Sequence, residues 1–258
     1  MTLTHEQRAE LIECLLDMGQ ILLENGAEIS RVEDTLLRTG KAYGARHVDV
    51  FVITSIIILS IEFDDLDALT ETRRIYSSTG TFFHKIERVN SLSRSLSREL
   101  IPLSELRASL NDISCMNKND SVIIIGGVIA AGSFTLFFGG SVDDSVAASV
   151  FAVFVIALQN YLGRTEINTT ALNLLVSLII GLCVGVLCKV CTFIHMDKIL
   201  IGDIMLLIPG LAMTNAVRNI LVGNTISGAV RLIESFIWAL ALAGGFMTAM
   251  LVTDIIFS

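Results

Sequence analysis

The chain has 258 residues and a formal net charge of −8, with 53% hydrophobic and only 17% charged residues. Soluble domains carry about 25% charged residues, so this composition argues against an ordinary soluble protein. The acidic balance, with no basic stripe interleaved with aromatic residues, argues against a nucleic-acid partner. The polar, acidic start of the chain lacks the pattern of a signal peptide, so we expect the N-terminal part to stay in the cytosol.

The charged residues are divided unevenly along the chain. Residues 1–120 hold 13 of the 18 Lys and Arg and 19 of the 26 Asp and Glu, and residues 121–258 hold the other 5 and 7. We therefore predict an α-helical polytopic membrane protein, with about five transmembrane helices and an N-terminal α+β cytosolic domain. The expected domains are a cytosolic domain at 1–114, a polar linker at 115–120 and a transmembrane domain at 121–258.

Residues 5–43 have the pattern of a helical hairpin. Thr4 and Gln7 form a capping-box pair before the first apolar stripe, and Gly26 is suited to end that helix. Ser30 and Glu33 repeat the capping-box spacing, which predicts the start of a second helix there.

The rest of the N-terminal part predicts a small sheet and two helices. β-branched runs favour strands at 47–54 and 56–63, with a third near 71–76. Helical spacing returns from Phe82 and is expected to end at Pro102, and Ser104–Ile113 forms another helix. Hydrolase, nucleotide-binding and zinc-protease motifs are missing from the sequence. We therefore expect no enzyme, catalytic residue, cofactor or metal.

The corner of the hairpin, GAEISRVEDT, gathers polar residues. Glu28 and Arg31 are three positions apart, and Arg31 shares a helix face with Asp34 and Thr35. One interpretation is a helix start with a surface ion pair, worth less than about 1 kcal/mol. The other is a polar cluster that docks on the membrane part or contacts a substrate.

Five stretches in the second half reach the ~20 apolar residues that a spanning helix needs. They are 121–140, 145–162, 170–193, 199–222 and 226–255. With the N-terminal domain inside, Arg164, Arg218 and Arg231 fall on the cytosolic side, in modest agreement with the positive-inside rule. Five spans then place the C-terminus outside.

The last two spans carry polar and charged side chains. On a helical wheel, Asp203, Gly210, Thr214 and Arg218 share one side of the fourth span, and Asn215 and Asn219 extend it. Arg231 and Glu234 align on the fifth. Ionisable groups within spans normally face a bundle interior or a wet cavity. Pro209–Gly210 breaks the fourth span in its middle, either as part of a transport site or as a structural kink.

Three stretches together resemble the bacterial threonine/serine exporter family. They are GAEISRVEDT, FFGGSVDD and LLIPGLAMTNAVRNILVGNTISGAVRLIES. The matching positions in the corner and in the membrane part are Gly26, Ala27, Glu28, Arg31, Val32, Glu33, Gly139, Gly140, Asp143, Pro209, Gly210, Thr214, Asn215, Arg218, Gly228, Arg231 and Glu234. Nearly the whole chain is covered.

The resemblance implies a multi-pass exporter of the bacterial inner membrane, carrying threonine and serine or a dicarboxylate such as succinate. Because long members of the family carry a second membrane half, this chain looks like the larger subunit of a split exporter. We then expect a separately encoded small membrane subunit as its partner, in an oligomer surrounded by membrane lipid.

Roles can be suggested for four ionisable residues of the membrane part. Arg218 or Arg231 could meet a substrate carboxylate, and Glu234 or Asp203 could carry a coupling proton. A membrane-anchored signalling or scaffold subunit is the alternative function, and its activity would remain in residues 1–114. A membrane-embedded hydrolase is a third possibility, but the spans lack an evident nucleophile–base pair.

Overall fold

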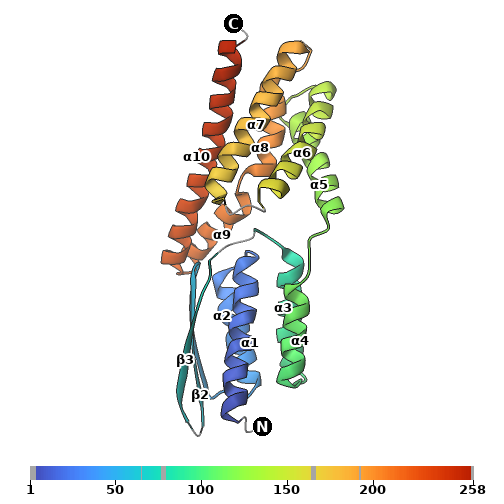
Figure 1. Cartoon of the computed structure of the whole chain (residues 1–258). Helices are drawn as coiled ribbons and strands as arrows, with labels where there is room; N and C mark the ends of the chain where they lie inside the picture. Colours follow the sequence, from blue (N-terminus) through green and yellow to red (C-terminus); the bar gives the residue numbers. More distant parts are fainter. Residues whose placement is uncertain (1–3, 65, 77–79, 164–166, 192, 257–258) are drawn as a thin grey trace. The chain divides into compact units, whose positions relative to one another are not determined.

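The computed structural model describes residues 4–64, 66–76, 80–163, 167–191 and 193–256. It divides into two compact units (Figure 1). The first unit contains Met1–Asn117 together with Ala212–Leu232, and the second contains Lys118–Leu211 together with Ile233–Ser258. The polar segment 212–232 therefore belongs with the N-terminal residues, although the sequence places it among the membrane spans.

The first unit has four helices and an antiparallel sheet in the order β1-β2-β3 among its described N-terminal residues. The helices are α1 (His5–Glu24), α2 (Ile29–Ala42), α3 (Phe83–Leu96) and α4 (Leu103–Ser114), and the strands are β1 (His47–Ile53), β2 (Ile56–Phe63) and β3 (Leu66–Arg74). The predicted α+β fold is confirmed.

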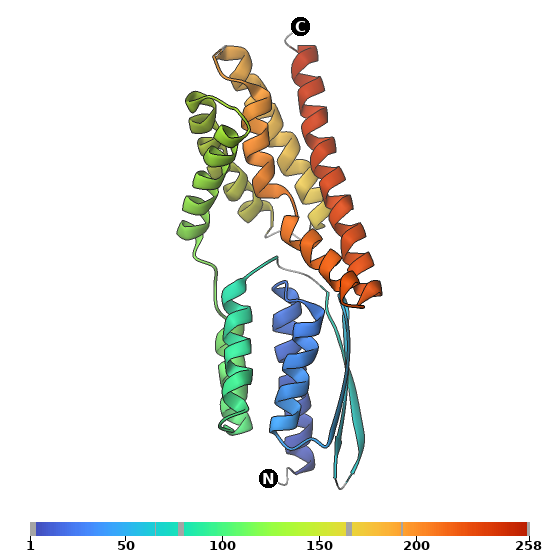
Figure 2. The same cartoon turned by 180° about the vertical axis from the view of Figure 1, so that it is seen from behind.

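These elements lie in three layers. Both views show α1 and α2 between the sheet and the α3–α4 pair (Figures 1 and 2). The burial of β2 alternates along the strand, and Ile57, Leu59 and Ile61 are fully buried. Alternation is the mark of a sheet with one face on a core, and here α1 and α2 cover that face.

Four sequence-based details of this unit can be compared with the structure. The Thr4 capping box is confirmed, because the Thr4 hydroxyl accepts from the Gln7 N–H and Gln7 accepts from the Thr4 N–H. The second capping box is wrong, because α2 begins at Ile29 and places Ser30 inside the helix. The third strand begins at Leu66, earlier than predicted, because the charged residues typical of an edge strand obscure its strand pattern in the sequence. The third helix ends at Leu96 rather than at Pro102, which is the N-cap of α4.

The remaining helices supply the candidate membrane spans. They are α5 (Asp120–Phe137), α6 (Val142–Leu162), α7 (Thr169–Val190), α8 (Met196–Leu207), α9 (Gly210–Leu221) and α10 (Thr225–Ile256). Within the described ranges, four helices are long and apolar enough to cross a membrane, or five if the bent α8–α9 pair is one span. This agrees with the prediction of about five. Arg164, used above for orientation, lies outside the described residues.

The second unit combines a tightly packed interior with an apolar exterior. Leu240, Val190, Ile255 and Phe137 are 70–79% exposed, as expected for side chains that face lipid. Inside, glycines let the helices approach closely. A Cβ on Gly245 of α10 would lie 2.6 Å from the carbonyl oxygen of Leu174 on α7. Small residues rather than large apolar ones therefore set these helix spacings.

Candidate functional site

The fourth span is broken at the predicted proline. α8 ends at Leu207, α9 begins at Gly210, and the two axes differ by 51°. Ile208 is extended, as residues before proline prefer to be. Pro209 has no N–H to donate to the Met205 carbonyl, and the Gly210 N–H donates to the Ile208 carbonyl at 2.8 Å instead. With 12 residues, α8 is about 18 Å long, too short to cross a ~30 Å hydrocarbon core alone.

Asp203 lies on the buried side of α8. Its side chain has no solvent exposure, and neither carboxylate oxygen has a hydrogen-bond partner among the described residues. The preceding residue, Gly202, packs so closely that an added Cβ would lie 2.7 Å from the Ala131 carbonyl oxygen of α5 and would clash with the Thr135 hydroxyl. Intramembrane carboxylates are rare and usually functional, so Asp203 is the candidate that the second unit offers.

The polar residues of α9 contact the corner between α1 and α2, within the first unit. The Arg218 guanidinium donates to the Glu28 carboxylate, with 2.5 Å between Nη1 and Oε1. Asn215 donates its Nδ2–H to the Gly26 carbonyl at 3.4 Å. Asn219 is buried, and its Nδ2 has no hydrogen-bond partner in the described chain. Two of the three stretches that carry the family resemblance, far apart in the sequence, therefore contact each other.

Local backbone geometry leaves the Glu28 carboxylate available for this contact. Gly26 has a φ of 83°, and its N–H and that of Ala27 donate to carbonyls in the last turn of α1. This is the left-handed ending for which glycine is preferred. Glu28 is the N-cap of α2, but its side chain makes no capping hydrogen bond. Ala27 is buried beneath the turn.

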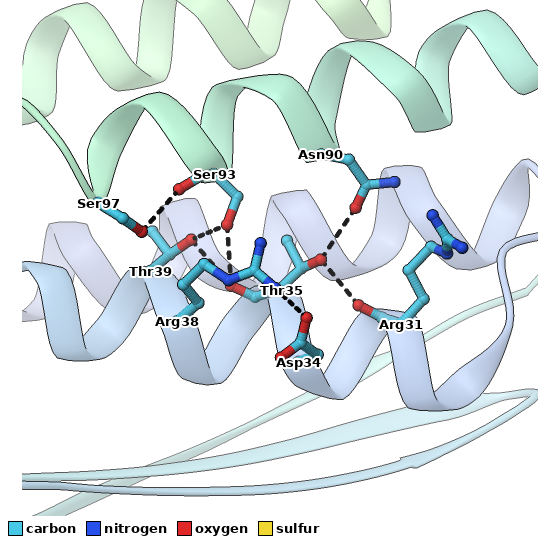
Figure 3. A network of polar contacts seen from close by, with 8 residues as sticks. All are labelled: Arg31, Asp34, Thr35, Arg38, Thr39, Asn90, Ser93 and Ser97. Atoms are coloured by element: carbon cyan, nitrogen blue, oxygen red, sulfur yellow. Dashed lines mark hydrogen bonds and ion pairs between the residues drawn. The ribbon is translucent and has the colours of Figure 1, made fainter.

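The other corner residues point to different partners. Arg31 is exposed, and its carbonyl accepts from the Thr35 hydroxyl at 2.7 Å. The Thr35 hydroxyl also contacts Asn90 of α3 (Figure 3). Asp34 pairs with Arg38 along α2. Burial raises the pKa of Glu33 above its ordinary value, although a hydrogen bond from the Val52 backbone acts in the opposite direction. The Thr35–Asn90 contact joins α2 to α3, and the Glu33–Val52 hydrogen bond joins α2 to β1.

The remaining predicted residues of the fourth and fifth spans are less enclosed. Thr214 on α9 and Glu234 on α10 are exposed, and Arg231 is partly exposed. The start of α10 instead packs through Gly228, where an added Cβ would lie 2.7 Å from the Ala216 carbonyl of α9. The structure thus distinguishes Asp203, which is enclosed, from Glu234, which is not.

At the start of α6 the structure encloses Asp144, which the sequence-based prediction did not include, next to the predicted Asp143. Asp143 is exposed. The fully buried Asp144 carboxylate accepts from the N–H and hydroxyl of Ser141 and from the backbone N–H and Nδ1 of His195. The capping-box spacing of Ser141 and Asp144 is the signal that could have identified it. Across the described ranges, no cluster of three or more His, Cys, Asp or Glu could hold a metal ion.

A bundle of membrane-spanning helices, one of them broken in its middle and carrying a buried carboxylate, has the architecture of a multi-pass membrane transporter. Residues 13–253 match the profile of a family described as "Putative threonine/serine exporter". The chain belongs to this threonine/serine exporter family, whose members are described as transporters.

Three related proteins match most of this chain but differ in how much of their own length the match covers. It is 21% identical over 249 residues to a "Threonine/serine exporter" of Corynebacterium glutamicum, covering 93% of this chain and 51% of that protein. It is 22% identical to proteins named "Probable succinate transporter subunit YjjP" from Klebsiella aerogenes and Escherichia coli. Those matches cover 95% and 92% of this chain and 94% and 90% of the relatives. The chain therefore spans about half the length of the Corynebacterium relative. No solved structure matches it.

Proposed function

We propose that this protein is one subunit of an exporter for a small carboxylate-bearing metabolite in the bacterial inner membrane. The candidate substrates are threonine and serine, or a dicarboxylate such as succinate. The observation that carries the proposal is the break at Pro209 inside the fourth span. Transporters place substrates near helices interrupted at membrane depth, because the freed backbone groups there can line a cavity.

The subunit assignment is supported by the relatives of matching length. Both are named as transporter subunits, so the partner we propose is a separately encoded small membrane protein of the same family. Their names also support a dicarboxylate, whereas the family name supports an amino acid. Both substrate classes carry a carboxylate at an end of the molecule, and an arginine can bind such a group through paired hydrogen bonds.

The transport path in this proposal follows the broken helix. Its residues are Asp203, Pro209, Gly210, Thr214, Asn215, Arg218, Asn219, Arg231 and Glu234, with Asp143 at one helix start. We propose the cytosolic side for the N-terminal residues and the outside for the C-terminus. Arg218 is the candidate for the substrate carboxylate because its guanidinium already binds a carboxylate, that of Glu28.

The test is efflux from bacteria loaded with labelled threonine or labelled succinate. Cells would express this chain alone, the small subunit alone, or both. Efflux of one substrate only when both are present supports the proposal, and efflux of neither at full expression contradicts it. If the Asn215→Ala and Arg231→Ala variants export like wild type, those two residues are not part of the transport path. Activity retained by residues 1–114 alone would favour a signalling role.

A further inference from the structure

The second unit contains a carboxylate for which the described residues provide no hydrogen-bonded counter-charge. Asp203 is fully buried, and both of its oxygens lack hydrogen-bond partners within the described part of the chain. One turn away along α8, Ile199, Leu200 and Leu207 are also buried. The carboxylate is therefore held among apolar side chains rather than at a polar surface.

The close packing of α8 keeps water away from this position. Gly202 leaves no room for a Cβ between α8 and α5, and the same added atom would lie 3.3 Å from Ala148 of α6. The nearby Thr135 hydroxyl donates to the Ala131 carbonyl at 2.8 Å. The Thr135 hydroxyl therefore donates its proton within α5 and not to Asp203.

None of the described ionisable side chains on α8 and its neighbouring helices hydrogen-bonds to the Asp203 carboxylate. Helices α5, α6 and α7 pack against α8. The ionisable side chains on these four helices are Asp120, Asp143, Asp144, Tyr161, Cys183, Cys188, Lys189, Asp197 and Lys198. Asp144 is engaged with Ser141 and His195, Lys189 with Asp254, and Lys198 with Asp197. Over the ranges described, none of them hydrogen-bonds to Asp203.

A carboxylate in such surroundings is stable only in its neutral form. An ionised carboxylate without a partner in an apolar medium is strongly disfavoured, whereas the protonated acid loses far less on leaving water. A metal cation would require several further oxygen ligands, and the described residues provide no such cluster. A proton, which needs no further ligands, is therefore the ligand that fits this site best.

The structure assigns Asp203 as a proton-binding site that couples substrate export to the proton gradient. This rests on the proposed export function. The sequence left Asp203 and Glu234 as equal candidates, and Glu234 is exposed whereas Asp203 is enclosed. In each cycle a hydronium ion on one side loses a proton, and its O–H bond breaks as an O–H bond forms on the carboxylate. The proton is held while the bundle is closed. On the other side the carboxyl O–H bond breaks, and a water molecule takes up the proton.

The first experiment detects the bound proton without requiring transport. The full chain would be purified in lipid nanodiscs, and the infrared C=O stretch of a protonated carboxylic acid would be recorded against pH. We expect a band in wild type that is lost in Asp203→Asn. The matched control is Asp197→Asn, which removes an exposed acid from the same helix and should keep the band. Absence of any Asp203-dependent band across the pH range would overturn the proposal.

The second experiment measures coupling in everted membrane vesicles that contain this chain and its small partner, with labelled threonine and labelled succinate as probes. One proton moving down about 100 mV can sustain roughly a fifty-fold substrate ratio. Asp203→Asn should abolish accumulation driven by a pH gradient but retain exchange of labelled for unlabelled substrate. Retained exchange also shows that the variant folds, and Asp203→Glu should recover part of the accumulation.

The outcomes separate the proton site from the export function. Gradient-driven accumulation that persists in Asp203→Asn would overturn the coupling role, as would accumulation driven by sodium ions alone. If wild type transports neither probe but shows the Asp203 band, the proton site stands and the proposed function fails. If transport occurs but the band is missing from wild type, the proposed function stands and the proton site fails.

Discussion

Arg218 of α9 and Glu28 at the start of α2 are joined by a hydrogen bond of 2.5 Å, although 190 positions separate them in the chain. The Glu28 side chain is 17% exposed and the Arg218 side chain 58% exposed. Asn215, one turn earlier on α9, reaches the backbone of the same corner at Gly26. The corner and the α9 segment therefore behave as one structural element of the first unit.

The first prediction concerns this ion pair. Glu28→Ala and Arg218→Ala should each lower the stability of the purified full chain, and the double variant should cost less than the sum of the two. The coupling free energy should be roughly 0.5–1 kcal/mol, because the arginine is half exposed. Thermal unfolding in detergent at low and high salt measures it, and the coupling should shrink as salt screens the pair.

Charge reversal supplies the control for that cycle. Glu28→Arg combined with Arg218→Glu restores an attractive pair and should recover the stability lost by either change alone. If the same double variant still fails to export, Arg218 has a role with substrate beyond its contact with Glu28. A cycle with no coupling at low salt would show that the pair does not form.

The second prediction compares two neighbouring glycines of α10. Gly245→Ala should destabilise the bundle by about 1–3 kcal/mol, because the new Cβ meets backbone atoms of α7 that cannot rotate away. Gly244→Ala adds its Cβ to open space and should be neutral or slightly stabilising. Thermal unfolding of the two variants in the same detergent measures the difference. Equal effects would contradict the α7–α10 packing described here.

The third prediction concerns the helix break. Pro209→Ala restores an N–H to the position and should let α8 continue into α9, with stability equal to wild type or higher by up to about 3 kcal/mol. Export should fall although the protein is stable, because the backbone carbonyls that Pro209 leaves unpaired would become hydrogen-bonded within the helix. Efflux normalised to membrane expression measures this. Pro102→Ala, at the N-cap of α4, is the matched control and should leave export unchanged.

The fourth prediction concerns pH. Burial raises the pKa of Tyr43 to about 12, and its hydroxyl donates to the Ile101 carbonyl at 2.9 Å. Because the folded state favours the protonated phenol, its stabilisation is complete below pH 10 and is lost as the pH rises through about 12. Tyr43→Phe should cost about 0.5–1.5 kcal/mol at neutral pH.

Absorbance of tyrosinate during an alkaline titration of the full chain tests the same residue. Tyr43→Phe should remove the step near pH 12, whereas Tyr76→Phe, which changes a largely exposed side chain, should leave that step in place. Loss of the step in both variants, or in neither, would contradict the assignment.

Local patterns were sufficient for much of the architecture. The capping box at Thr4, the break at Pro209 and the apolar lengths of the spans depend on neighbouring residues alone, so they can be found without a partner segment. The start of α2 could not be found this way. The sequence predicted Ser30 as its cap, whereas the helix begins at Ile29 after Glu28, whose side chain makes no capping hydrogen bond and so leaves no local signal.

The composition and spacing of this chain by themselves determined its two-part character, its class as a multi-pass membrane protein and the polar residues that interrupt its spans. Only the tertiary structure decided which of those residues are enclosed and which are paired. Helical spacing places Asp203 and Arg218 on the same side of one span, but burial and ion pairing depend on what other segments contribute. Those segments leave Asp203 without a hydrogen-bond partner in the described residues and pair Arg218 with Glu28.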